Sequence, residues 1–149
     1  MNFKEYKTII FDCDGVILNS NNVKTEAFRE ALSSYEEDLV NEFIAYHKLN
    51  GGISRYEKIK FFLKNLAPKY NYTNEIVNYN LLIKRFSSIC TEALYKVEVA
   101  EGLKRLRDHN SFSKWLVISG GDQLELRDVF DFKGIYDYFN GGIFGSPDK

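Results

Sequence analysis

The chain has 149 residues, a formal net charge of −1 and 44% hydrophobic residues. This length fits one domain, or one domain with an inserted subdomain, and the apolar content excludes a disordered chain. Twenty basic and twenty-one acidic residues leave no excess charge for nucleic acid or a membrane surface, so we expect neither as a partner. No apolar export signal is present and only two cysteines occur, which favours a reduced, cytoplasmic compartment.

The first predicted element is a buried strand. Residues 8–11, with the sequence Thr-Ile-Ile-Phe, form a continuous apolar run that is typical of a parallel strand covered on both faces. The run leads directly into Asp12-Cys13-Asp14-Gly15, where polar residues return.

A helical segment follows, from about residue 23 to residue 95. Apolar residues recur there at three- and four-residue spacing, which predicts four amphipathic helices. Gly51-Gly52 separates the second helix from the third, and Pro68 is expected to end the third.

The start of the third helix is predicted from a capping motif. Ser54 with Glu57 three residues later is typical of a capping box. The lysines Lys58, Lys60 and Lys64 interleave with the apolar stripe, and we expect all three to be exposed to solvent.

Beyond residue 97 the pattern changes to alternating helices and strands. The predicted elements are a helix over residues 102–109, a strand over 115–118, a helix opened by Asp122 and Glu125, and a strand over 141–145. This alternation predicts an α/β fold with a Rossmann-like parallel sheet. We therefore expect a discontinuous core of residues 1–18 and 97–149, with an inserted four-helix cap over residues 19–96.

Polar residues follow the strands at the edge where parallel sheets bind ligands. Asp12 and Asp14 lie two residues apart, so on an extended segment their carboxylates point the same way and repel unless a cation lies between them. Hard oxygen ligands of this kind suit Mg²⁺ with a substrate phosphate. The alternative is a strand that ends in an ordinary Asp-Gly turn.

Three segments resemble the motifs of the haloacid dehalogenase-like (HAD) hydrolases, in the same order. Residues 11–20, Phe-Asp-Cys-Asp-Gly-Val-Ile-Leu-Asn-Ser, are similar to the first motif, and residues 115–121 to the second, a strand that ends in Ser or Thr. Residues 145–149, Gly-Ser-Pro-Asp-Lys, resemble the third. The helical insertion lies where one HAD subclass carries its cap.

This resemblance implies a role for each motif residue. Asp12 is the expected nucleophile, and Asp14 the acid that protonates the leaving group and then the base that activates water. Both are expected at a Mg²⁺ site, Asp14 through its backbone carbonyl. Ser119, Gly120 and Lys149 are expected to bind the phosphoryl oxygens.

The loop around Gly51-Gly52 supplies two further candidates. In capped relatives this junction selects the substrate, which makes Arg55 and His47 candidate substrate contacts, with the planar fork of Arg55 suited to an anion. The alternative is a glycine loop followed by a helix cap, with Arg55 solvated.

The resemblance therefore implies a Mg²⁺-dependent phosphatase of a small phosphorylated metabolite, with a sugar phosphate as one candidate. A phosphomutase and a catalytically inactive truncated binding domain are the alternatives. The acidic fourth motif of the family and its last two strands are not found up to Lys149. We therefore expect a fragment that binds Mg²⁺ weakly and self-associates through the unpaired edge of the strand at residues 8–11.

Overall fold

The computed structural model describes residue 3, residues 5–73 and residues 75–147, with the backbone alone for residues 75–77. No helix in this part of the chain is long and apolar enough to cross a membrane.

The chain forms two compact units. The sheet unit comprises Met1–Ser20 and Tyr95–Lys149, and the helical unit comprises Asn21–Leu94. The boundaries expected from the sequence differ from these by two residues at each junction. The first strand is therefore joined to the rest of its sheet through the whole helical unit.

The sheet unit contains three parallel strands in the order β1-β2-β3. They are β1 (Thr8–Phe11), β2 (Lys114–Asp122) and β3 (Gly142–Ser146). Phe11 pairs with Val117, and Val117 pairs in turn with Ile143. The predicted α/β class with a parallel sheet is therefore confirmed.

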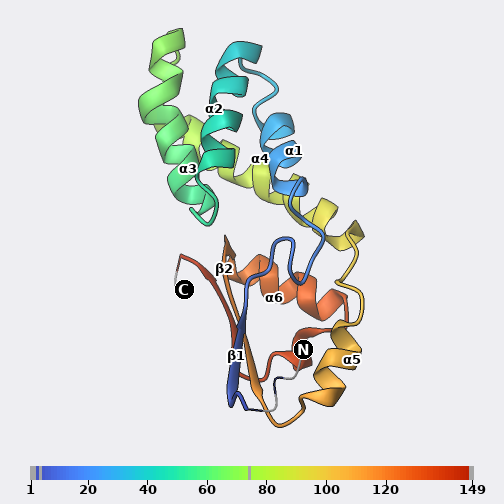
Figure 1. Cartoon of the computed structure of the whole chain (residues 1–149). Coiled ribbons are helices and arrows are strands. Elements are labelled where there is room, and N and C mark those ends of the chain that lie inside the picture. The colour runs from blue at the N-terminus through green and yellow to red at the C-terminus, as the bar shows by residue number, and fades with distance from the viewer. Residues whose placement is uncertain (1–2, 4, 74, 148–149) are drawn as a thin grey trace. The chain divides into compact units, whose positions relative to one another are not determined.

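One face of this sheet is covered by the helices α5 (Leu103–His109) and α6 (Gln123–Phe132) (Figure 1). An aromatic cluster fills the space beneath them. The fully buried Trp115 lies against Phe11 with ring centroids 4.7 Å apart, and the Arg107 guanidinium of α5 lies over the Trp115 ring. On the other face, Ile10 and Ile118 remain 60% and 44% exposed.

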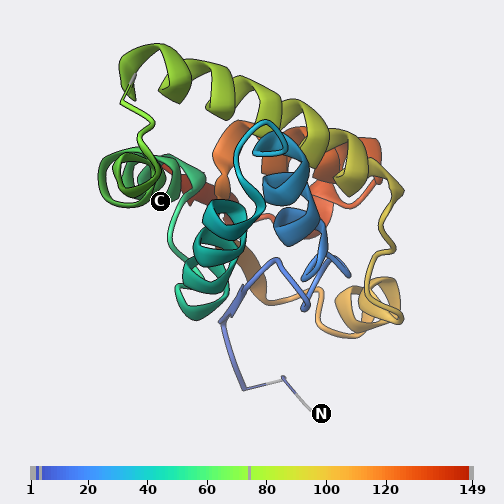
Figure 2. The same ribbon diagram turned by 90° about the horizontal axis from the view of Figure 1, so that it is seen from above.

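The described residues of the helical unit form four α-helices, as the apolar spacing predicted. They are α1 (Val23–Ala31), α2 (Glu37–Leu49), α3 (Arg55–Phe61) and α4 (Glu75–Lys96). Helix α4 runs across the other three helices (Figure 2), and its Phe86 ring stacks on Phe28 of α1 with centroids 4.0 Å apart. Phe43 of α2 packs edge-on against Phe28, so aromatic side chains form the centre of this unit.

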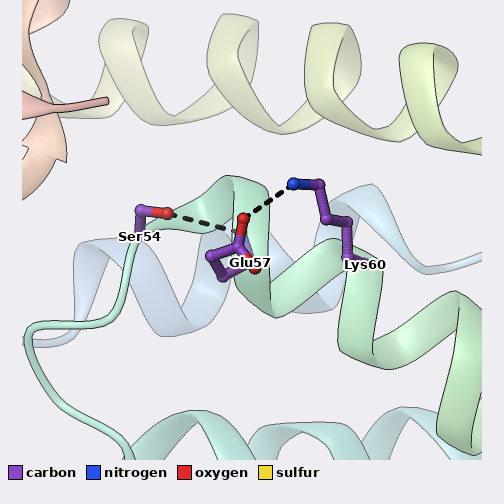
Figure 3. Close-up of polar contacts among 3 residues, drawn as sticks. All are labelled: Ser54, Glu57 and Lys60. Carbon is purple, nitrogen blue, oxygen red and sulfur yellow. Dashed lines mark hydrogen bonds and ion pairs between the residues drawn. The ribbon is translucent and has the colours of Figure 1, made fainter. Parts of the chain in front are cut away.

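The third helix ends differently from the prediction. Pro68 does not terminate α3; a π-helical turn (Phe62–Leu66) follows α3 directly, and Pro68 lies in a 3₁₀ turn (Ala67–Tyr70). The irregular turns keep Phe62, Leu63 and Leu66 buried. The predicted capping of α3 is confirmed, because the Ser54 hydroxyl accepts a hydrogen bond from Glu57 N (Figure 3).

Residues 17–19 and residues 98–100 of the sheet unit are joined by backbone hydrogen bonds. Asn19 N donates to Glu98 O, and Ala100 N donates to Ile17 O. Lys133, at the end of α6, donates to the carbonyl of Val97 at 2.6 Å, and burial lowers the pKa of this lysine. The segment that carries Asp14 and Ser20 is thus fixed to the sheet unit.

Candidate active site

Asp12 lies at the carboxyl end of β1, the first position after the strand. Its side chain is exposed, and its Oδ1 accepts a hydrogen bond from Cys13 N at 2.7 Å. Since Phe11 pairs with Val117, continuing the parallel register brings Asp12 alongside Ile118, the residue before Ser119. The side chain is therefore presented at the edge where parallel sheets bind ligands.

The chain turns tightly after Asp12 instead of staying extended. The Cys13 carbonyl accepts hydrogen bonds from Ile17 N and Leu18 N, and Gly15 N donates to Leu18 O at 2.8 Å. Gly15 has φ 71°, a conformation that costs a residue with a side chain about 1–2 kcal/mol. The extended geometry expected from Asp12 to Asp14 is not found, because the chain bends at Cys13, between the two aspartates.

Asp14 lies inside this turn and is half-buried. Its Oδ1 accepts a hydrogen bond of 2.7 Å from the hydroxyl of Ser20, a residue with no exposed surface. The same hydroxyl lies 3.3 Å from Leu18 O. In the sequence, Ser20 is marked only as the last residue of the first motif. A spacing of six residues from Asp14 does not predict the hydrogen bond, because the contact forms only when the chain turns.

The end of β2 is irregular where it carries the predicted phosphate site. The strand was expected to end at Ile118, but it continues through Ser119, Gly120 and Gly121 to Asp122. Ile118 pairs with Phe144 and Asp122 with Ser146, so the pairing register shifts between them. Such a bulge redirects side chains and backbone amides, and bulges are common next to active sites.

Ser119 is held inside this bulge. Its side chain is buried and its Oγ accepts a hydrogen bond from Gly121 N at 3.0 Å. Strand β3 approaches closely here, because a Cβ on Gly145 would lie 2.5 Å from Gly121 O. A glycine at position 145 is therefore required for the bulge and β3 to pack together.

Asp122 has the role of a helix cap. Its Oδ1 accepts a hydrogen bond of 3.0 Å from Glu125 N at the start of α6, as the sequence predicted.

We refer to residues 12–20 and 119–122 together as the carboxyl edge. Lys149, the third predicted phosphate ligand, lies outside the described residues.

Arg55 and His47 belong to the helical unit, in a region that we call the α2–α3 junction, defined by His47, Arg55 and Lys58. Arg55 is 5% exposed, its Nη1 donates to Ser87 Oγ at 2.9 Å, and its guanidinium lies 4.7 Å from the centroid of the Phe86 ring. The alternative of a solvated Arg55 is therefore wrong.

The expectation that Lys58 is exposed to solvent is wrong. Lys60 and Lys64 are exposed as predicted, but Lys58 is only 4% exposed. Its Nζ lies 2.9 Å from His47 Nδ1, while His47 Nε2 lies 3.1 Å from the hydroxyl of Thr25. An ammonium group only donates, so this geometry makes Nδ1 the acceptor and leaves the ring proton on Nε2.

The oxygen donors at the carboxyl edge fit a hard divalent cation. Within the residues that the structure describes, no cluster of three or more His, Cys, Asp or Glu side chains could hold a metal ion. Mg²⁺ does not require such a cage, since it binds through one or two carboxylates together with waters and substrate phosphates. The exposed carboxylate of Asp12 and the oxygen atoms of Asp14 fit that requirement.

The chain is an α/β protein with a parallel sheet. Two aspartates follow its first strand and a bulged serine–glycine segment lies near the end of its second, at the edge where parallel sheets bind ligands. The chain belongs to the haloacid dehalogenase-like hydrolases, because residues 6–149 match the model of that family.

Solved structures with similar folds support this assignment. A predicted phosphoglycolate phosphatase from Haemophilus somnus 129pt has a TM-score of 0.71 at 15% identity, over 99% of this chain and 66% of that one. The HAD-hydrolase YfnB from Bacillus subtilis, solved bound to magnesium, has a TM-score of 0.66 at 17% identity, over 95% and 65%. A protein from Thermotoga maritima assigned as a beta-phosphoglucomutase has a TM-score of 0.58 at 17% identity, over 93% and 61%.

The TM-scores show that these proteins share the fold of this chain. The chain spans 61–66% of the length of these three relatives.

Proposed function

We propose that this chain carries the nucleophile and the acid–base residue of a Mg²⁺-dependent phosphatase that acts on a small phosphorylated metabolite. The observation that supports this most strongly is the strand register. Because Phe11 pairs with Val117, Asp12 and the Ser119-Gly120 segment come to the same edge of one sheet. A nucleophile and the donors for a phosphoryl group are required at one place.

In the proposed first step, Asp12 attacks the phosphorus of the ester. Its Oδ1 already accepts a hydrogen bond from Cys13 N, which leaves Oδ2 as the attacking atom. As the new O–P bond forms, the bond from phosphorus to the ester oxygen breaks and Asp14 gives that oxygen its proton. The products are an alcohol and an aspartyl phosphate.

In the second step, Asp14 takes a proton from water, and the resulting hydroxide oxygen attacks phosphorus. The O–P bond to Asp12 breaks, inorganic phosphate leaves and both aspartates return to their starting states. Two displacements replace one difficult hydrolysis, which is the advantage of a covalent intermediate.

The phosphoryl oxygens would be bound at the bulge of β2. The Ser119 hydroxyl accepts from Gly121 N and still carries a proton that it can donate. The backbone amide of Gly120 is a second proposed donor, and Lys149 a third by its resemblance to the family motif. Donors aimed at the transferring group stabilise the charge that develops on it.

Mg²⁺ would be held by the Asp12 carboxylate and the Asp14 backbone carbonyl, and when bound it would neutralise charge on the transferring phosphoryl group. The helical unit is proposed as a substrate-selecting cap. Arg55 and His47 are its proposed substrate contacts, with Arg55 offering a planar fork to an anionic group.

A phosphomutase is the second candidate, and the fold shared with the Thermotoga maritima protein favours it over unrelated activities. In that reaction the aspartyl phosphate returns its phosphoryl group to the substrate. The two candidates share Asp12 and Asp14 and differ in the product.

The experiment that tests the proposal measures inorganic phosphate released from a panel of phosphorylated metabolites, with Mg²⁺ and with a chelator. Mg²⁺-dependent phosphate release supports the phosphatase, whereas an isomerised sugar phosphate without phosphate release supports the mutase. If no ester reacts although the chain binds phosphorylated ligands, the proposal is wrong and the chain is a binding domain.

A further inference from the structure

The side chain of Gln123 binds β3 at the point where the pairing of β2 with β3 is interrupted. Its Oε1 accepts a hydrogen bond from Gly145 N at 3.3 Å. In a regular parallel pair, the N–H groups of one strand donate to backbone carbonyls of its neighbour. Here the acceptor is a side chain, and it belongs to the first residue of α6. Gln123 therefore ties the end of β3 to the start of that helix.

The interruption is the bulge of β2. Between the paired residues Ile118–Phe144 and Asp122–Ser146, β2 advances by four residues and β3 by only two. Residues 119–121 fall in this gap, and a bulge disrupts the ladder of hydrogen bonds around it. The proposed phosphate donors lie in this stretch, so their directions depend on contacts other than regular strand pairing.

Gly145 fits closely between the bulge and α6. A Cβ at Gly145 would lie 2.5 Å from Gly121 O and 2.9 Å from Gln123 N. The buried Ser119 Oγ in turn accepts a hydrogen bond from Gly121 N at 3.0 Å. Because these atoms are already in close contact, a displacement of Gly145 would be passed on to Gly121 and to the Ser119 hydroxyl.

A second side chain of α6 binds β3 further from the bulge. Arg127, one helical turn after Gln123, donates from Nε to Ile143 O at 3.1 Å. Ile143 pairs with Val117 in the regular part of the sheet. Residues four apart lie on the same face of a helix, so this face of α6 binds β3 at two points. Of these two bonds, that of Gln123 lies beside the bulge.

We infer that Gln123 is a positioning residue for the proposed phosphate site. Its carboxamide oxygen holds the end of β3 against the bulge, and this fixes the directions of the Ser119 hydroxyl and the Gly120 amide. The inference rests on the proposed function and deepens it. Gln123 acts through Gly145 and Gly121 and does not touch the substrate. Its effect should therefore fall on the phosphoryl group, which all substrates share, and not on the leaving group.

The test measures the binding of inorganic phosphate, which carries the group that the bulge would contact. Gln123→Met keeps the length of the side chain without the oxygen acceptor. It should weaken phosphate binding about tenfold, because a misdirected donor loses most of a hydrogen bond to a charged group. Calorimetry with Mg²⁺ and the Ki for phosphate during hydrolysis of para-nitrophenyl phosphate, an aryl ester, measure this effect.

The same variant should lower kcat/KM about 10- to 100-fold, the cost of a misplaced binding group. The factor should be equal for para-nitrophenyl phosphate and for glycerol phosphate, an alkyl ester, because both carry the same phosphoryl group.

Asn140→Leu is the matched control. The Oδ1 of Asn140 also accepts a hydrogen bond from a strand, from Trp115 N at 3.0 Å, at the amino end of β2. Loss of this acceptor should leave phosphate binding and kcat/KM unchanged, and thermal unfolding measures the stability of both variants. A merely structural role of Gln123 predicts the same pattern for Gln123→Met.

Unchanged phosphate affinity in a folded Gln123→Met chain would overturn the inference while leaving the phosphatase intact. A larger loss for glycerol phosphate than for para-nitrophenyl phosphate would place Gln123 at the leaving group and overturn it equally. If Gln123→Met does not fold, Gln123→Asn has an amide one methylene shorter, and an unchanged phosphate affinity in that variant counts against the inference in the same way.

Failure of the proposed function has a different signature. If the wild-type chain binds phosphate but hydrolyses neither ester, the proposed function is wrong, and the calorimetric comparison of the variants alone decides the inference. A wild-type chain that binds no phosphate and hydrolyses neither ester would overturn both.

Discussion

The carboxyl edge and the α2–α3 junction hold their polar side chains in different ways. At the carboxyl edge the hydrogen bonds join near neighbours in sequence, six residues apart for Ser20 and Asp14 and two for Gly121 and Ser119. At the junction they span 11 residues for Lys58 and His47 and 32 for Arg55 and Ser87.

The sequence separation of the hydrogen-bonded residues indicates how each region should respond to substitution. Local turns can place reactive groups at a strand end with few supporting contacts, whereas the cations of the junction depend on the packing of four helices. Substitutions at the edge should therefore act mainly on activity. Substitutions at the junction should lower stability, and those of Arg55 and His47, the proposed substrate contacts, should alter substrate preference as well.

The largest expected effect is on the nucleophile. Asp12→Asn should abolish turnover, because an amide cannot form the acyl phosphate, while the free energy of unfolding should change by less than about 0.5 kcal/mol at this exposed position. Phosphate release and thermal unfolding measure the two effects. Phosphate release close to that of the wild type would contradict the mechanism.

The next effect concerns Asp14. Asp14→Asn should slow alkyl phosphate hydrolysis about 10²- to 10⁴-fold, the usual contribution of general acid–base catalysis, and aryl phosphate hydrolysis much less. Steady-state kinetics with both esters measure the difference. Equal losses for the two esters would argue against Asp14 as the acid.

At the junction, Lys58→Ala should lower the free energy of unfolding by about 1–3 kcal/mol, because His47 loses a buried hydrogen-bond partner. Lys60→Ala is the control on the same helix. Lys60 makes an exposed ion pair with Glu57 (Figure 3), and such pairs contribute about 0–1 kcal/mol. Equal destabilisation by the two variants in urea titrations would remove the contrast between a buried and an exposed lysine.

One substitution in β3, next to the carboxyl edge, should lower the free energy of unfolding. Gly145→Ala should destabilise the fold by about 1–3 kcal/mol, because its Cβ would lie 2.5 Å from Gly121 O and 2.9 Å from Gln123 N. Gly51→Ala is the control, since a Cβ there would meet no atom within 4 Å. Chemical denaturation of both variants tests whether close strand packing supports the bulge.

The smallest expected change is in the association of two copies of this chain. We propose that β1 mediates contact with a second copy of the chain, because β1 is an edge strand of the described sheet and its Ile10 is 60% exposed. Ile10→Lys should therefore shift sedimentation toward the monomer, whereas Leu81→Lys, at an equally exposed position of α4, should not. A wild-type chain that is monomeric at all concentrations would contradict this prediction.

Much of this molecule could be predicted from patterns in the sequence. The apolar run of β1, the helical spacing of the inserted unit and the caps at Ser54 and Asp122 depend on neighbouring residues, and the structure has each of them. The position of Asp12 directly after the first strand was also predicted, but the expectation that this strand is covered on both faces is wrong, since Ile10 is 60% exposed. Strand period and helix period are properties of adjacent residues, so they can be recognised without a fold.

Only the tertiary structure decided the surroundings of the polar groups. The turn after Asp12 brings Ser20 onto Asp14, the pairing with β3 accommodates the bulge at Ser119, and helix packing buries Lys58 against His47. The spacing of Lys58, Lys60 and Lys64 along the chain does not distinguish the one buried lysine from its exposed neighbours. Burial depends on which other elements lie against a side chain, and those elements come from residues far away in the sequence.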